Sequence, residues 1–235
     1  MNPGTQFFSV GRLEDVFPKV LDALPVTLAI VLAGLLIGGA LGVVIAFIRI
    51  HHVPVLEQIA VVYISFVRST PEIVQLFIVY YGVPLLVQMI AGVDLGSVEA
   101  LYFVLLAFGI NQSGYLAELF RGGFEAVPKG QYEAAAAIGL TGVQTFRRVI
   151  VPQAVRLIVP GLGIVIVALF KNTSIAATLG VADMMGKAGL IGAATYHYLE
   201  PYAAATILFL TVSIGLEVLF RYVDRRFVFG GRQAA

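Results

Sequence analysis

The residues of this chain that could do chemistry are polar and charged side chains set inside long apolar stretches. Those well inside such stretches are Arg68, Thr70, Glu72, Gln75, Asn111, Lys171, Thr173 and Ser174. A cation and an acid in one cavity could hold a zwitterion, because an α-amino acid needs a cationic donor for its carboxylate and an acceptor for its ammonium. Charges inside an apolar span usually mark a function and face protein or water. We therefore treat this set as a candidate path for a polar solute.

Catalysis and metal binding lack the residues that they would need. Cysteine is absent and only three histidines occur, which excludes disulfides, thiol catalysis and zinc–thiolate sites. The sequence has no nucleophile–base pair, no metal-ligand cluster and no GxxxxGK[ST] phosphate loop, so the chain is not expected to hydrolyse ATP itself. A net charge of +1 also argues against a nucleic-acid binder. We expect no catalytic residue, no metal site and no cofactor.

The composition predicts where the chain resides. Of its 235 residues, 59% are hydrophobic and 12% are charged, and the mean hydropathy is +0.94. Soluble globular chains carry about 25% charged residues. The chain is therefore predicted to be an integral membrane protein surrounded by a lipid bilayer.

Five apolar stretches are long enough to cross a bilayer as helices, which takes about 20 residues each. They cover residues 24–48, 57–91, 100–120, 157–181 and 202–220. Alternating runs of the porin type are absent, and no linker or repeat divides the chain. We therefore expect an all-α membrane protein with five transmembrane helices in a single domain, residues 1–235. Pro71 interrupts the second span, and the segment 171–174 breaks the fourth about halfway.

The distribution of Lys and Arg predicts the orientation, because cytoplasmic ends collect them. With five spans, ten basic residues fall on one side: Arg49, Arg121, Lys129, Arg147, Arg148, Arg156, Arg221, Arg225, Arg226 and Arg232. Three fall on the other: Arg12, Lys19 and Lys187. The N-terminus is therefore predicted outside and the C-terminus in the cytoplasm.

The longest inside connection, residues 121–152, has a pattern of two short helices. Strong helix formers fill Gln131–Ile138, and Gly139 stops them as a C-terminal cap would. Thr141 and Gln144 form a capping-box pattern that opens a second helix, which is expected to end before Pro152. Without any catalytic group, such an element suits docking. A plain connecting loop on the membrane surface is the alternative.

The polar residues inside the spans also allow plainer roles. Arg68 and Glu72 have i,i+4 spacing, so they could reach one cavity or form a structural ion pair that holds the kink at Pro71. Asn111 could bind a solute, although hydrogen bonds between helices are its more usual role. The donors of Lys171–Ser174 suit either a carboxylate or a partner backbone.

An ordered set of segments resembles the ABC-importer permeases that take up polar amino acids. It consists of Tyr63, Phe66 to Pro71, Gln75, Gly114-Tyr115, Glu118, Arg121-Gly122, Glu133-Ala134-Ala135, Gly139, Phe146, Val149, Pro152-Gln153, Pro160 and Lys171 to Ser174. The similarity covers roughly residues 20 to 226. It implies a type I importer permease fold in the bacterial cytoplasmic (inner) membrane, with the EAA segment as the coupling loop.

The resemblance also implies the partners. Glu133, Ala134, Ala135 and Gly139 would couple to an ABC ATPase subunit, which binds the ATP. A second permease, either another copy or a paralogue, would complete the path, since five helices are too few to enclose one, and an extracytoplasmic solute-binding protein would deliver the solute.

Four positions depart from the family pattern: Glu72, Ile164, Asn172 and Asp183. None of them lies in the coupling loop. They cluster in the membrane, so they leave open which polar amino acid, or derivative such as an opine, is carried. The alternative function is a self-sufficient secondary amino-acid carrier or channel. That class predicts inverted repeats and no docking helix, whereas this sequence shows a docking helix and no repeat.

Overall fold

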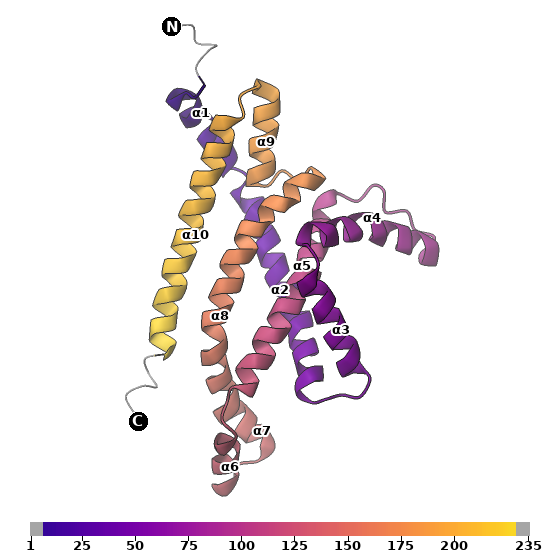
Figure 1. The fold of residues 1–235 in the computed structure, drawn as a ribbon, viewed down its shortest axis with the longest axis vertical. Coiled ribbons are helices and arrows are strands. Elements are labelled where there is room, and N and C mark those ends of the chain that lie inside the picture. Colours follow the sequence, from indigo (N-terminus) through magenta and orange to yellow (C-terminus); the bar gives the residue numbers. More distant parts are fainter. Residues whose placement is uncertain (1–6, 229–235) are drawn as a thin grey trace.

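The computed structural model describes residues 7–228 and is helical (Figure 1). The long helices are α2 (Leu24–Ile50), α4 (Glu72–Ala91), α5 (Ala100–Glu125), α8 (Val151–Asn172) and α10 (Leu199–Val228). The shorter ones are α1 (Val10–Leu21), α3 (Leu56–Ser69), α6 (Lys129–Ala137), α7 (Gly142–Thr145) and α9 (Met184–Thr195). A π-helical turn, η2 (Phe146–Ile150), and a 3-10 helix, η3 (Thr173–Leu179), flank α8. Residues 7–228 contain no strand, which confirms the all-α class.

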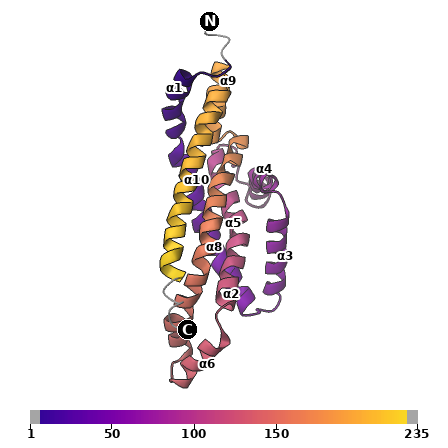
Figure 2. The same cartoon turned by 60° about the vertical axis from the view of Figure 1, so that its left-hand side comes forward.

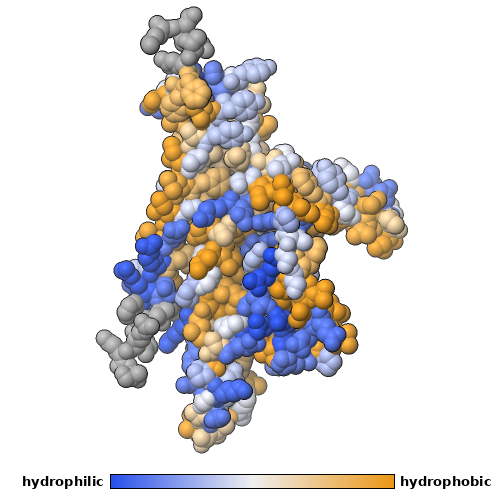
Figure 3. All heavy atoms as spheres, viewed as in Figure 1, coloured by the Kyte–Doolittle hydropathy of each residue, from blue (hydrophilic) through white to orange (hydrophobic). Residues whose placement is uncertain are grey.

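Helices α2, α5, α8 and α10 run along the long axis of the molecule (Figures 1 and 2). Helices α6 and α7 form the tip at one end, while α1 and α9 lie at the other. Five helical segments are long and apolar enough to cross a membrane: Leu24–Ile50, Glu72–Ala91, Ala100–Glu125, Gly142–Leu179 and Leu199–Arg226. The predicted number of spans is confirmed. Large apolar side chains stay exposed on the bundle's outer surface (Figure 3), as lipid contact requires.

Glycines bring α2 against α5, the helix at the centre of the bundle. A Cβ on Gly38 would lie 2.8 Å from the Cβ of Gln112, and one on Gly42 would lie 3.1 Å from the backbone nitrogen of Ala117. Small residues permit this close approach, the usual way in which helices associate in lipid. A Cβ on Gly39, the next residue, would meet no atom within 4 Å.

The second predicted span, 57–91, consists of two helices rather than one. Thr70 adopts an extended conformation (φ −105°, ψ 145°), so α3 ends at Ser69 and α4 begins at Glu72. A residue before proline is pushed out of the helical region by the proline ring, which explains the break before Pro71. Helix α4 then runs across the long axis, and Figure 2 shows it nearly end-on.

The start of the fourth span differs from the expectation that a helix ends before Pro152. The helix continues through Pro152 because η2 precedes it: the Val151 N–H donates to the Phe146 carbonyl, five residues back. Such a π-turn shifts the hydrogen-bond ladder by one residue, and the missing N–H of Pro152 falls in the first turn of α8, where proline is tolerated. At its other end α8 stops at Asn172 and η3 follows, so the expected break lies at the end of this helix.

Two short helices are anchored at the end of the molecule opposite α6. In α1, Ser9 caps the helix, and the fully buried Glu200 of α10 accepts hydrogen bonds from the Ser9 N–H (2.9 Å) and from Arg12 Nη2 (2.6 Å). In α9, Asp183 caps the helix and accepts from the Gly186 N–H at 2.8 Å. Burial raises the pKa of the Asp183 carboxyl, and its backbone hydrogen bonds only partly offset this.

Candidate docking loop and solute path

The loop between α5 and α8 has the predicted helix–glycine–helix structure. Gly139 lies after the end of α6 with φ +79°, a conformation that favours glycine. The capping box is formed: the Gln144 N–H donates to Thr141 Oγ1 (3.4 Å), and the Thr141 N–H donates to Gln144 Oε1 (2.9 Å). The first short helix therefore ends, and the second begins, where their cap residues predict.

The outer surface of this loop combines a charged residue with small and apolar ones. Glu133 and Ala134 are exposed, whereas Ala135 is buried against the loop's own helices. Ile138 and Val143 are 77% and 70% exposed at the tip of the molecule. Apolar side chains gathered on an exposed tip are typical of a protein-docking surface. The sequence analysis did not select either residue for docking, although apolar residues on both sides of Gly139 indicate a docking turn.

The loop is attached firmly to the bundle. Val127, Ile150, Ala154 and Ile158 form a separate buried cluster that joins the loop to α5 and α8. The rings of Phe124 and Phe146 stack with their centroids 5.8 Å apart. A force on α6 and α7 would therefore reach α5 and α8 through packed side chains.

Several predicted path residues brace the bend between α3 and α4. Gln75 Nε2 donates to the Val67 carbonyl and to Thr70 Oγ1, both at 2.7 Å. Asn111 Nδ2 on α5 donates to Gln75 Oε1 at 3.1 Å, and both side chains are buried. These contacts realise the interhelical hydrogen bonding that was one of the two roles considered for Asn111.

The structural ion pair that was one of the two alternatives for Arg68 and Glu72 is absent from the described residues, 7–228. The break at Thr70 removes the helical i,i+4 register that the pair requires. Arg68 instead lies over the Tyr115 ring, 5.9 Å from its centroid. It lines a polar groove of about 430 Å³ together with Glu118, which pairs with Arg121 at 2.7 Å and also with Arg49.

Glu72 joins the start of α4 to the end of α8. Its Oε2 accepts from Asn172 Nδ2 at 2.6 Å across 100 positions of sequence. Its Oε1 is buried and has no hydrogen-bond partner in the described chain. The structure therefore leaves one acceptor of this acid free beside the junction of α8 and η3.

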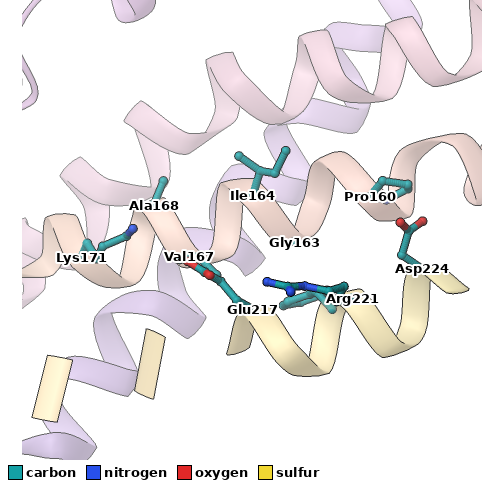
Figure 4. A pocket seen from close by; sticks show the side chains of 10 residues that line it. Pro160, Gly163, Ile164, Val167, Ala168, Lys171, Glu217, Arg221 and Asp224 are labelled. Atoms are coloured by element: carbon teal, nitrogen blue, oxygen red, sulfur yellow. The ribbon is translucent and has the colours of Figure 1, made fainter. Parts of the chain in front are cut away.

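Lys171 and Ser174 line a groove between α8 and α10 that continues from the middle of the molecule in both directions. Figure 4 shows the part of the groove nearer α6, which encloses about 450 Å³, with Lys171 on α8 and Glu217 on α10. The adjoining part, about 670 Å³, shares both residues and reaches Met185. Neither Lys171 nor Glu217 has an ion-pair partner within residues 7–228. The sequence analysis did not select Glu217 as a path residue, although an acid inside the fifth apolar stretch marks it as a candidate.

The predicted set thus divides into separate places. Thr70, Gln75 and Asn111 brace the bend, Arg68 lines the polar groove, and Lys171 and Ser174 line the α8–α10 groove. Thr173 is buried and donates to the Phe170 carbonyl at 2.8 Å, so it faces none of them. Groups of three or more His, Cys, Asp or Glu residues that could hold a metal are absent from the described chain.

Comparison with known proteins identifies the family of this helical bundle and loop. Residues 34–229 match the family described as the binding-protein-dependent transport system inner membrane component. The chain belongs to this family. It is therefore a multi-pass membrane permease of the ABC-importer type and is not itself the catalytic subunit.

Among its relatives, this permease is 39% identical over 219 residues to the L-cystine transport system permease protein TcyL of Bacillus subtilis (strain 168), which covers 93% of this chain and 91% of that one. It is 35% identical to the nopaline transport system permease protein NocM of Agrobacterium fabrum, with 87% of each chain covered. The names of these two relatives give different solutes, L-cystine and nopaline.

Solved structures show the same fold for the permease. A chain of an amino acid ABC transporter, in a crystal structure with histidines, matches with a TM-score of 0.82 and 30% identity over 93% of this chain and 99% of that one. A chain of the inward-facing MetNI methionine transporter matches at 0.65 and 21% over 94% and 100%, which shows the fold alone. The expected type I importer fold is confirmed.

Proposed function

We propose that this permease imports a polar amino acid by alternating access in the bacterial cytoplasmic membrane, driven by a separate ATPase that docks on α6 and α7. The observation that carries the proposal is the exposed tip formed by Ala134, Ile138 and Val143 around the hinge at Gly139. This tip offers a small apolar surface without a catalytic group, and the short helices that carry it are attached firmly to the bundle. The amino-acid permeases among the relatives support the class of solute.

The proposed topology has the α6–α7 tip in the cytoplasm and α1 and α9 outside. Ten basic residues against three support this orientation. An extracytoplasmic solute-binding protein would then deliver the solute at the α1–α9 end. The ATP would be bound by the partner subunit, and a second permease would complete the path.

The docking surface can be tested in proteoliposomes that hold the permease, its ATPase and its binding protein. Ala134→Arg buries a charge at the interface, and an unpaired buried charge costs about 3 kcal/mol, or roughly 100-fold in affinity for the ATPase. Gly139→Val strains the left-handed turn, which disfavours β-branched residues. Both variants should lose solute-stimulated ATP hydrolysis and uptake while staying inserted.

Matched controls keep the geometry. Ala134→Ser retains a small side chain, and Gly139→Asn retains a residue that tolerates positive φ, so both should transport nearly as well as the unaltered permease. If the Arg and Val variants still bound the ATPase and transported normally, α6 and α7 would not be the coupling element. Uptake by the permease alone, without ATP, would favour the secondary carrier.

A further inference from the structure

Helix α3 carries a polar face within an otherwise apolar segment. Ser65, Arg68 and Ser69 are exposed and share this face, because i,i+3 and i,i+4 neighbours lie side by side on a helix. A second face exposes large apolar side chains, among them Ile59 and Val62. Charged side chains at membrane depth are costly in lipid and face protein or water instead. The apolar face therefore suits lipid, whereas the polar face borders water or a polar ligand.

The polar face of α3 lines the polar groove of about 430 Å³, whose other charged residues are Arg49 and Glu118. This volume is within the range typical of small-molecule sites. Arg49 lies in the last turn of α2, and Glu118 lies in the last third of α5, which leads to α6. In Figure 3, hydrophilic surface rises from the lower part of the α2–α3 region between apolar areas. The groove therefore lies toward the end of the molecule that carries α6 and α7.

The groove contains a cation that no acid neutralises. Glu118 is already paired, with Arg49 at Oε1 and with Arg121 at Oε2 (2.7 Å). Within residues 7–228 Arg68 forms no ion pair, and its guanidinium lies over the Tyr115 ring. A guanidinium presents its donors as a rigid fork that matches the two oxygens of a carboxylate, and serine hydroxyls can donate as well. The groove therefore fits a small carboxylate better than a cation.

We propose that this groove is a carboxylate site open to the cytoplasm, in which Arg68, Ser65 and Ser69 bind the α-carboxylate of an amino acid that has already been imported. A ligand that binds one conformation better than another holds the protein in it, so the released amino acid slows further uptake. The site recognises the group that all α-amino acids share. The proposal rests on the proposed function for the class of solute and for the cytoplasmic position of the α6 end.

The absence of native cysteine allows the groove to be probed by labelling. Ser65→Cys places a thiol in the groove. His52→Cys is the matched control, because this side chain is 77% exposed in the turn between α2 and α3. Inside-out vesicles that hold the permease with its ATPase are treated with an impermeant maleimide. The ligands are L-arginine and L-glutamine, each compared with its α-carboxamide.

Each amino acid should slow the labelling of Ser65→Cys, roughly tenfold at ten times its dissociation constant. The α-carboxamides lack the carboxylate and should not protect, and the labelling of His52→Cys should not change with any ligand. Adding Arg68→Gln to Ser65→Cys should abolish the protection. Arg68→Lys should keep part of it, because lysine retains the charge but not the fork.

The effect on transport is measured on the same Ser65→Cys complex in proteoliposomes loaded with the amino acid. Half-maximal inhibition of ATP-driven uptake should occur at the internal concentration that gives half-maximal protection. Protection at concentrations that leave uptake unchanged would overturn the inhibition by released solute.

Three further results would overturn the carboxylate site: protection by the carboxamides, equal protection of His52→Cys, or no protection at all. Slow labelling that becomes fast in vesicles without anionic phospholipid would place a lipid headgroup in the groove and would also overturn it. Uptake is measured separately on the unaltered complex. ATP-driven uptake without protection would refute the site and leave the proposed function standing, whereas protection without ATP-driven uptake would do the reverse.

Discussion

At the scale of single residues, Glu72 is the side chain whose role the structure changes most. The spacing to Arg68 allowed an ion pair that would have explained an acid inside a span. The structure removes that explanation, because Arg68 lies against Tyr115 and Glu72 accepts a hydrogen bond from Asn172. Within the described chain one oxygen of this acid has no hydrogen-bond partner. A charge left in hydrocarbon costs roughly 3 kcal/mol, so a charged Glu72 must meet water or a cation. A solute ammonium is such a cation.

Changing Glu72 to Gln should therefore alter selectivity rather than assembly. Gln keeps an oxygen that can accept from Asn172 but carries no charge, so the junction of α4 and α8 should persist. We expect normal amounts of assembled complex, unchanged basal ATP hydrolysis and an altered ranking among amino acids, measured as uptake of several solutes in proteoliposomes. Glu72→Leu, which also removes the acceptor, serves as the comparison for loss of the junction. An equal loss for every solute with less assembled complex would contradict a solute-binding role for Glu72.

At the scale of elements, local sequence predicts caps well and continuations poorly. Gly139, Thr141 and Gln144 act on neighbours within three residues, so the two short helices of the loop could be read directly. The predicted helix end before Pro152 was wrong because a proline alone predicts a helix end, whereas here the preceding π-turn shifts the hydrogen bonds so that the helix continues through Pro152. That turn depends on the packing of Ile150 and Phe146 against the bundle, which no local pattern encodes.

Pairings across elements were the other part that sequence did not yield. Residue types alone marked Glu72, Asn111 and Lys171 as polar groups in lipid, and this was enough to select them. Their partners depend on how α4, α5 and α8 meet, and the hydrogen bond from Asn172 to Glu72 joins residues 100 positions apart. Without the crosswise direction of α4, neither that bond nor the separation from Arg68 could be foreseen.

The contact between α2 and α5 gives a prediction with a matched control in the next residue. A side chain on Gly38 would meet the Gln112 Cβ at 2.8 Å and the Gly109 carbonyl oxygen at 3.1 Å, whereas one on Gly39 meets nothing within 4 Å. Overpacking of this kind costs about 1–3 kcal/mol. Gly38→Val should lower the melting temperature and yield of the purified permease, and Gly39→Val should leave both nearly unchanged. Equal effects of the two changes would contradict the close packing of these helices at Gly38.

At the scale of the whole molecule, the bundle is strongly asymmetric along its axis. One end carries the short helices α6 and α7. The other carries α1 and α9, which are held by hydrogen bonds to the buried carboxylates of Glu200 and Asp183. Alternating access needs such a division, because force must enter at one face and the solute at the other. Helix α4 runs across the axis and adds a lateral surface between the two ends (Figure 1).

The orientation of this asymmetric molecule is the last prediction, and the cysteine-free sequence makes it measurable. Gly130→Cys lies on the exposed side of α6, where an added side chain meets no atom within 4 Å, and Ser97→Cys lies in the exposed connection between α4 and α5. Since basic residues gather at the α6 end and cytoplasmic ends collect them, that end should face the cytoplasm. An impermeant maleimide added to intact spheroplasts should then label Ser97→Cys at once and Gly130→Cys only after the membrane is opened. The opposite order would invert the topology and place the docking tip away from any ATPase that uses cytoplasmic ATP.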